Sequence, residues 1–163
     1  MSGEGQSGLA KRVAALASDF ALTKDSPFIY MRTMPRLLDP QEVGDFIEAL
    51  FVECSHRLDE TGIKVIAFDT FNRALVGGNE NDGRDVGRLL HADERIKRAF
   101  SCATIYAHHP GKAEGNDTRG HSSLRGDIDV TAIFSGKSGT RTIEIKKQKD
   151  EEDGAINQAK GTT

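Results

Sequence analysis

Apolar residues recur every three or four positions in three stretches of the chain, which is the spacing of one face of an α-helix. These stretches cover residues 7–22, 40–62 and 86–99. The second opens on Asp39-Pro40, where the aspartate can cap the helix and proline suits the first helical position. We predict an amphipathic helix in each stretch.

Short continuous runs of apolar, β-branched and aromatic residues alternate with these helices. Residues 64–70 and 102–107 form two such runs, whose length and flanks favour buried strands. A third, weaker run at residues 27–34 is bracketed by prolines and predicts a short extended segment. Helices that alternate with buried strands are typical of a parallel sheet flanked by helices. The pattern therefore predicts an α/β fold.

The last third of the chain follows a different pattern. Residues 128–135 and 140–147 are rich in β-formers and flank the turn-like sequence Gly136-Lys137-Ser138-Gly139, which is typical of a β-hairpin. Residues 71–84 and 109–125 are polar and contain several glycines, so we expect loops there. The predicted parallel sheet thus ends in a C-terminal antiparallel hairpin.

The length of 163 residues fits one domain of ordinary size. The longest apolar runs, such as residues 65–68, are far shorter than the roughly 20 residues that a membrane-spanning helix needs. The first five residues lack the basic and apolar pattern of a signal peptide. We therefore expect a soluble, cytoplasmic protein with no membrane partner.

Charge and cysteine content exclude some classes of protein. The net charge of −3 argues against a strongly basic nucleic-acid module, although it leaves room for local basic loops. Cys54 and Cys102 are the only cysteines and lack histidines at metal-ligand spacing, so a disulfide framework or a zinc site is disfavoured. We expect both thiols to be buried and unreactive.

Polar side chains follow two consecutive predicted strands. Asp69-Thr70 ends the first strand and His108-His109 ends the second. Ligands bind at the carboxyl edge of a parallel sheet, although an aspartate at a strand end is just as often a helix cap or a turn residue. Neighbours on a strand point to opposite faces, so the two histidines are poorly placed to share a metal. We expect one to face a phosphate and the other to pack.

Three further motifs are ambiguous when taken singly. Residues 119–126 place arginines on a glycine-containing loop, and residues 146–149 place lysines at the end of the last strand, where each run could simply be a solvated surface. Cations of this kind can stabilise a transferring phosphoryl group. Residues 3–8 match the dinucleotide-binding pattern G-x-G-x-x-G, but no strand precedes them. They do not form a phosphate-binding P-loop either, because the residue after Gly8 is not the lysine that such a loop requires.

Taken in order, these motifs resemble the RecA-type ATPase domain of RepA-like plasmid and phage replicative helicases, which are AAA family ATPases. The resemblance extends from about Gly3 to Gly154 and rests on the ordered set rather than on any one motif. It is carried by Glu4-Gly5, Phe68-Asp69-Thr70, His108-His109-Pro110-Gly111-Lys112, Arg119-Gly120-His121-Ser122-Ser123-Leu124-Arg125-Gly126 and Lys147-Gln148-Lys149-Asp150.

The resemblance implies a RecA-like P-loop NTPase core that uses ATP and Mg²⁺, assembles as a homo-hexameric ring and moves along single-stranded DNA. Residues 71–84 and 110–126 would face the lumen of the ring and contact that DNA. The resemblance implies that Glu4 is the base that polarises the attacking water, and that Asp69, beside Thr70, binds Mg²⁺ through water. It implies that His109, with Lys112 behind it, senses the γ-phosphate. Arg119 would be a finger that reaches the neighbouring subunit, and Lys147 and Lys149 would form a terminal finger pair.

The sequence also departs from this family. The resemblance places the phosphate-binding Walker A segment upstream of Glu4 and further strands after Asp150. We therefore expect a fragment truncated at both ends, with residues 1–154 as a partial RecA-like ATPase domain, residues 155–163 as a polar tail, and no activity alone. One alternative is a non-catalytic nucleic-acid or subunit-binding module of the same fold. The other is an unrelated hydrolase, but its G-x-S-x-G elbow is missing at residues 120–124.

Overall fold

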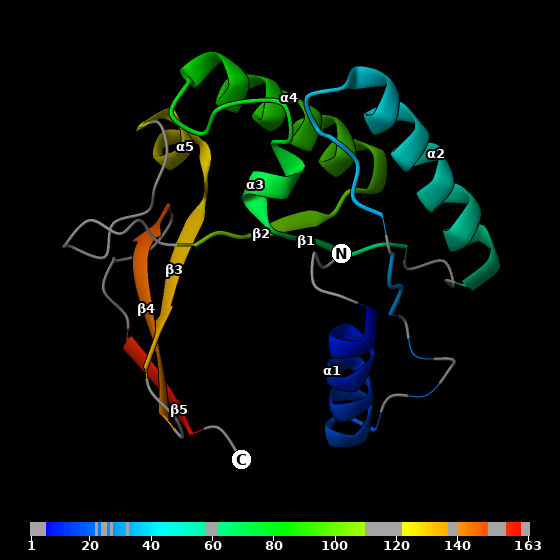
Figure 1. Cartoon of the computed structure of the whole chain (residues 1–163), viewed down its shortest axis with the longest axis vertical. Helices are drawn as coiled ribbons and strands as arrows, with labels where there is room; N and C mark the ends of the chain where they lie inside the picture. Colours follow the sequence, from blue (N-terminus) through cyan, green and yellow to red (C-terminus); the bar gives the residue numbers. More distant parts are fainter. Residues whose placement is uncertain are drawn as a thin grey trace.

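The computed structural model describes ten helices and strands in an α/β arrangement (Figure 1). The described residues are 6–21, 23, 26, 28–31, 33–57, 62–109, 122–136, 140–149 and 156–160. In chain order the elements are α1 (Gln6–Asp19), α2 (Pro40–Arg57), β1 (Val65–Asp69), α3 (Phe71–Ala74), α4 (Gly83–Phe100), β2 (Ala103–Ala107), α5 (Ser122–Asp127), β3 (Val130–Ser135), β4 (Thr140–Gln148) and β5 (Ile156–Lys160).

Strands β1 and β2 form the predicted parallel pair, with Val65 opposite Ala103 and Asp69 opposite Ala107. Helices α2, α3 and α4 lie on one side of this pair (Figure 1). Because side chains alternate along a strand, Ile66 and Phe68 are buried beneath the helices while Val65 on the other face is 53% exposed. The apolar core therefore lies between β1–β2 and its three helices.

The helix ends follow local chemistry. Asp39 caps α2 as predicted, because its Oδ1 accepts a hydrogen bond of 2.9 Å from the backbone N–H of Gln41. Asp82 caps α4 in the same way, accepting a bond of 2.8 Å from the backbone N–H of Arg84. Ser101 ends α4 in the left-handed conformation at φ 50°. These ends fix where the chain enters and leaves the core helices.

The predicted hairpin is confirmed as β3 and β4, which pair antiparallel. The structure adds β5 along β4, so the three strands form an antiparallel sheet of their own. Strand β5 lies within the residues expected as a polar tail, and the sequence did not predict a strand at Ile156–Lys160. These residues lack an alternating apolar pattern, and their pairing comes from backbone hydrogen bonds that any residue except proline can make.

Two other predictions from the sequence need correction. Residues 28–31 are neither helix nor strand, so the extended segment expected at 27–34 does not form a strand there. The expected loop at 71–84 contains the short helix α3, whose Phe71 and Ala74 are buried against the core. Polar residues separate Phe71 from Ala74 in the sequence, so no apolar periodicity predicts this helix. Of the helices in the described residues, none has the length and apolar character needed to cross a bilayer.

Candidate functional site

The carboxyl ends of β1 and β2 meet at one edge of the parallel pair. Asp69 is the last residue of β1 and lies opposite Ala107, the last residue of β2. Thr70 follows the first strand, and His108 and His109 follow the second. The expectation that two strands deliver polar side chains to one edge is confirmed, and this is the edge at which open α/β sheets bind ligands.

Asp69 and Thr70 offer oxygen ligands at this edge. Thr70 caps α3 only through its backbone, since its C=O accepts from Arg73 N–H at 3.0 Å while its hydroxyl makes no capping bond. Among the described residues, no side-chain partner engages the half-buried Asp69 carboxylate. Mg²⁺ in nucleotide sites uses one or two carboxylates and keeps several waters, so this donor set fits a hydrated Mg²⁺.

The two histidines occupy different environments, as alternation along a strand requires. His108 is largely buried: its Nε2 lies 3.3 Å from Glu80 Oε2, and its ring meets the ring of Phe71 edge-on at 5.1 Å. His109 is exposed. The packed histidine ties the turn before α4 to the sheet edge, which leaves His109 as the histidine available to a ligand. Glu80 was not identified from the sequence, because nothing local pairs it with a histidine 28 residues away.

A buried polar network supports the edge from below. The ring of Tyr106 stacks on Phe68 at 4.8 Å, and its hydroxyl donates a hydrogen bond of 2.7 Å to Asp93 Oδ1 on α4. Lys97 Nζ lies 3.5 Å from the other oxygen of Asp93. Burial, and then the negative charge of Asp93, raise the pKa of the Tyr106 hydroxyl well above its usual range. This network joins β2 to α4 directly beneath the site.

The two lysines at the end of β4 lie apart from this edge. Lys147 Nζ donates to the backbone carbonyls of Gly126 at 3.2 Å and Ile128 at 2.7 Å. Lys149 pairs with Asp129, and this hydrogen bond raises the pKa of the lysine and lowers that of the aspartate. Within the described residues, no hydrogen bond or ion pair joins either lysine to Asp69. Both instead connect the antiparallel sheet to the end of α5 and the residues that follow it.

The model of one protein family, described as AAA domain, matches residues 1–115. The chain belongs to the AAA domain family. No curated protein matches the sequence. This AAA domain is thus an ATPase-type nucleotide-binding module, and AAA ATPases generally use ATP and Mg²⁺. The matched range contains β1, α4 and β2, and so includes the edge at which Asp69 and His109 lie.

Three of the residues expected at the site of this AAA domain, Glu4, Lys112 and Arg119, lie outside the described residues. Of the other five, the structure brings Asp69, Thr70 and His109 to one edge and places Lys147 and Lys149 on the other sheet. Within the described residues, the candidate site at this edge is therefore built from strand ends, and the basic C-terminal motif lies elsewhere.

The Tyr106 network predicts a loss of stability at alkaline pH. The unfolded tyrosine ionises near pH 10, whereas the folded one ionises at higher pH, so the unfolded state releases its proton first. Stability should be complete below about pH 10 and fall above it by up to about 1.4 kcal/mol per pH unit. Urea denaturation across this range should show a shallower fall for Tyr106→Phe.

Lys97 titrates in the same direction, because its pKa is also raised, first by its hydrogen bond to Glu94. Lys97 is present in both the wild type and Tyr106→Phe, so the difference between their alkaline slopes reports the contribution of the tyrosine. Equal alkaline slopes for the wild type and Tyr106→Phe would contradict the assignment to Tyr106.

Proposed function

We propose that this AAA domain is the ATPase core of a RepA-like replicative helicase, which couples ATP hydrolysis to movement along single-stranded DNA. In the proposed assembly it acts in the cytoplasm as a homo-hexameric ring. The observation that carries the proposal is the meeting of Asp69 and His109 at the carboxyl edge of the β1–β2 pair. Membership of the AAA domain family supports the use of a nucleotide, and the ordered motifs of the sequence support the assignment to a helicase.

The side chains at this edge have complementary chemistry for a nucleotide. Asp69 would hold Mg²⁺ through water, and Thr70 would add a hydroxyl oxygen beside it. His109 is exposed and can donate a hydrogen bond toward the terminal phosphate. Mg²⁺ would supply neutralisation of phosphate charge. The chain's contribution is to orient that ion and to register the phosphate at the end of β2.

A second candidate is a non-catalytic nucleic-acid or subunit-binding module of the same fold. One observation favours it: residues 1–163 contain no G-x-x-x-x-G-K-[ST] sequence, whose backbone N–H groups and lysine cradle the phosphates of ATP. Under either candidate, we expect weak ATP binding by these residues alone. The two differ in whether supplying that cradle produces ATP hydrolysis.

Asp69→Asn tests the proposal. The wild-type chain is fused behind a strand and loop that carry the G-x-x-x-x-G-K-[ST] sequence, and ATP hydrolysis is measured with and without single-stranded DNA. Removing the charge of Asp69 should lower hydrolysis by about tenfold to thirtyfold, because a Mg²⁺ ligand loses its attraction for the ion. The chain without the fusion provides the ATP-binding baseline.

Asp45→Asn is the matched control, because it removes the same charge from an exposed site on α2. It should leave hydrolysis within about twofold of the unsubstituted fusion, since exposed charges away from the site are largely screened. If the fusion hydrolyses no ATP, or if Asp69→Asn and Asp45→Asn behave alike, the catalytic proposal fails and the binding-module candidate is favoured.

A further inference from the structure

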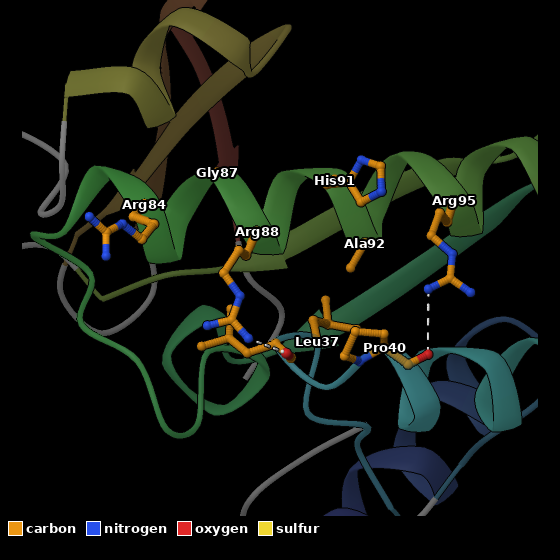
Figure 2. Close-up of a pocket in the computed structure, with 9 residues that line it drawn as sticks. Leu37, Pro40, Arg84, Gly87, Arg88, His91, Ala92 and Arg95 are labelled. Carbon is orange, nitrogen blue, oxygen red and sulfur yellow. Dashed lines mark hydrogen bonds between the residues drawn. The ribbon is translucent and has the colours of Figure 1, made fainter.

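One face of α4 carries a row of basic residues, Arg84, Arg88, His91 and Arg95, spaced by four, three and four residues. This spacing keeps them on one stripe of the helix. Together with Leu37 and Pro40, the row lines a groove of about 370 Å³ between α4 and the start of α2 (Figure 2). In the sequence, the dominant pattern of this helix is its apolar stripe, so the basic row does not stand out.

Two of the arginines are held in place from one side. Arg88 Nη2 donates a hydrogen bond of 2.8 Å to the carbonyl of Leu38, and Arg95 Nη1 donates one of 3.4 Å to the carbonyl of Pro40. Figure 2 shows Arg88 reaching from α4 toward the segment before α2 and Arg95 reaching toward Pro40, the first residue of α2. A guanidinium has five N–H donors, so each keeps most of its donors for a ligand. Anchoring of this kind lowers the entropy lost when a ligand binds.

Carboxylates offset little of this charge. Asp85 Oδ1 lies 3.7 Å from Arg88 Nη1, and its other oxygen accepts from the backbone N–H of Asn79. Asp93 and Glu94 on the same helix pair with Lys97 instead. The side chain of Arg88 remains 55% exposed, and Arg84 and His91 are exposed as well. The row is therefore a local positive surface on a chain whose net charge is −3.

The shape and composition of the row select its ligand. At about 1.5 Å per residue, the helix separates Arg84 from Arg95 by about 16 Å, which is a line of positive charge rather than a point. The planar fork of arginine matches phosphate oxygens. The described lining residues include no Phe or Tyr on which bases could stack.

We propose that the Arg84–Arg95 face of α4 binds the phosphodiester backbone of a nucleic acid without reading its bases. The inference rests on the proposed function only in sharing nucleic acid as the partner. It requires no ATP and no contact with Asp69, and it places the contact on a helix face rather than on the loops at residues 71–84 and 110–126. Single-stranded and duplex DNA share this backbone, and separate arms of the experiment distinguish them.

The test compares two triple variants of the chain in the absence of nucleotide. Arg84→Gln/Arg88→Gln/Arg95→Gln removes the row while keeping side chains that can donate hydrogen bonds. The matched control Lys11→Gln/Lys64→Gln/Lys146→Gln removes the same three charges from exposed positions outside the groove. Fluorescence anisotropy measures the affinity for labelled single-stranded and duplex oligonucleotides over a range of salt concentrations.

The row variant should bind at least about tenfold more weakly than the control, because phosphate contacts supply most of the affinity in sequence-independent binding. The slope of log K against log salt should fall by about 0.7 for each lost contact to a single strand and by about 0.9 for each lost contact to a duplex. The arm with the larger loss identifies the form of nucleic acid that the row binds.

His91→Glu keeps the inference testable if the triple variant folds poorly. It places a carboxylate in the middle of the row without removing either anchoring hydrogen bond, and it should weaken binding about fivefold relative to His91→Gln, because like charge repels phosphate. Equal binding by His91→Glu and His91→Gln would overturn the inference. So would binding of poly-glutamate, but of neither oligonucleotide, because the groove would then accept an acidic protein. Neither result affects the Asp69→Asn test of ATP hydrolysis, so the two proposals can fail independently.

Discussion

Replacing Phe68 with alanine is expected to lower the free energy of unfolding by about 3–5 kcal/mol, which is the usual cost of removing a buried phenylalanine side chain. Phe68 is 1% exposed in the middle of the core. Its ring stacks on Tyr106 at 4.8 Å and lies 6.1 Å from the ring of Phe46 on α2. The substitution leaves a cavity where strand β1 meets helix α2, and chemical denaturation measures the loss.

Phe134→Ala is the matched control, because it removes the same side chain from β3, where Phe134 is 71% exposed. Its cost should stay below about 1 kcal/mol, since an exposed ring contributes little apolar burial. Phe68 also precedes Asp69, so the cavity is expected to displace this carboxylate at the edge of the parallel pair. Equal losses of stability in the two variants would show that the described core does not hold the fold together.

Replacing Asp93 with alanine is expected to cost about 2–3 kcal/mol, because it strips a buried hydroxyl of its acceptor. Asp93 is the buried charged residue of the core, at 6% exposure, and it accepts the 2.7 Å hydrogen bond from Tyr106. Lys97, its second partner, is 31% exposed and can turn to water or to Glu94. The tyrosine therefore accounts for most of the expected loss.

Glu94→Ala separates this network from an ordinary surface ion pair. Glu94 is its neighbour on α4 and pairs with Lys97, but 49% of its side chain is exposed, so its removal should cost less than about 0.5 kcal/mol. A double-mutant cycle of Asp93→Ala with Tyr106→Phe should give a coupling energy of at least about 1 kcal/mol. Additive losses would mean that the two side chains contribute independently.

The sequence predicted the regular elements well wherever apolar periodicity is strong. Helices α2 and α4 and strand β1 formed where they were predicted and each buries apolar residues in the core, whereas strand β2 formed as predicted but is only partly buried. The sequence did not predict the two elements that lack an apolar pattern. Strand β5 is polar and joins β4 through its backbone, and α3 has too few residues to show a helical period.

Only part of the candidate site could be predicted from the sequence. A strand that ends in Asp69 and another that ends in His109 already predict a shared edge, because parallel strands point the same way. Glu80 was not identified because its partner His108 lies 28 residues away, and the arginine row of α4 was not identified because charged residues on a helix are usually solvated. Lys147 and Lys149 were expected by resemblance to form a terminal finger pair, and the structure shows that each also has a partner within the described chain.

The sequence by itself determined the α/β class, the order of its elements and the polar residues at the strand ends, because periodicity and strand direction are local properties. Only the tertiary structure decided which of two adjacent histidines packs, that Asp93 meets Tyr106, and that three arginines of α4 border a groove with the segment before α2. Such contacts depend on how distant segments pack together, and neither helical nor strand spacing encodes that.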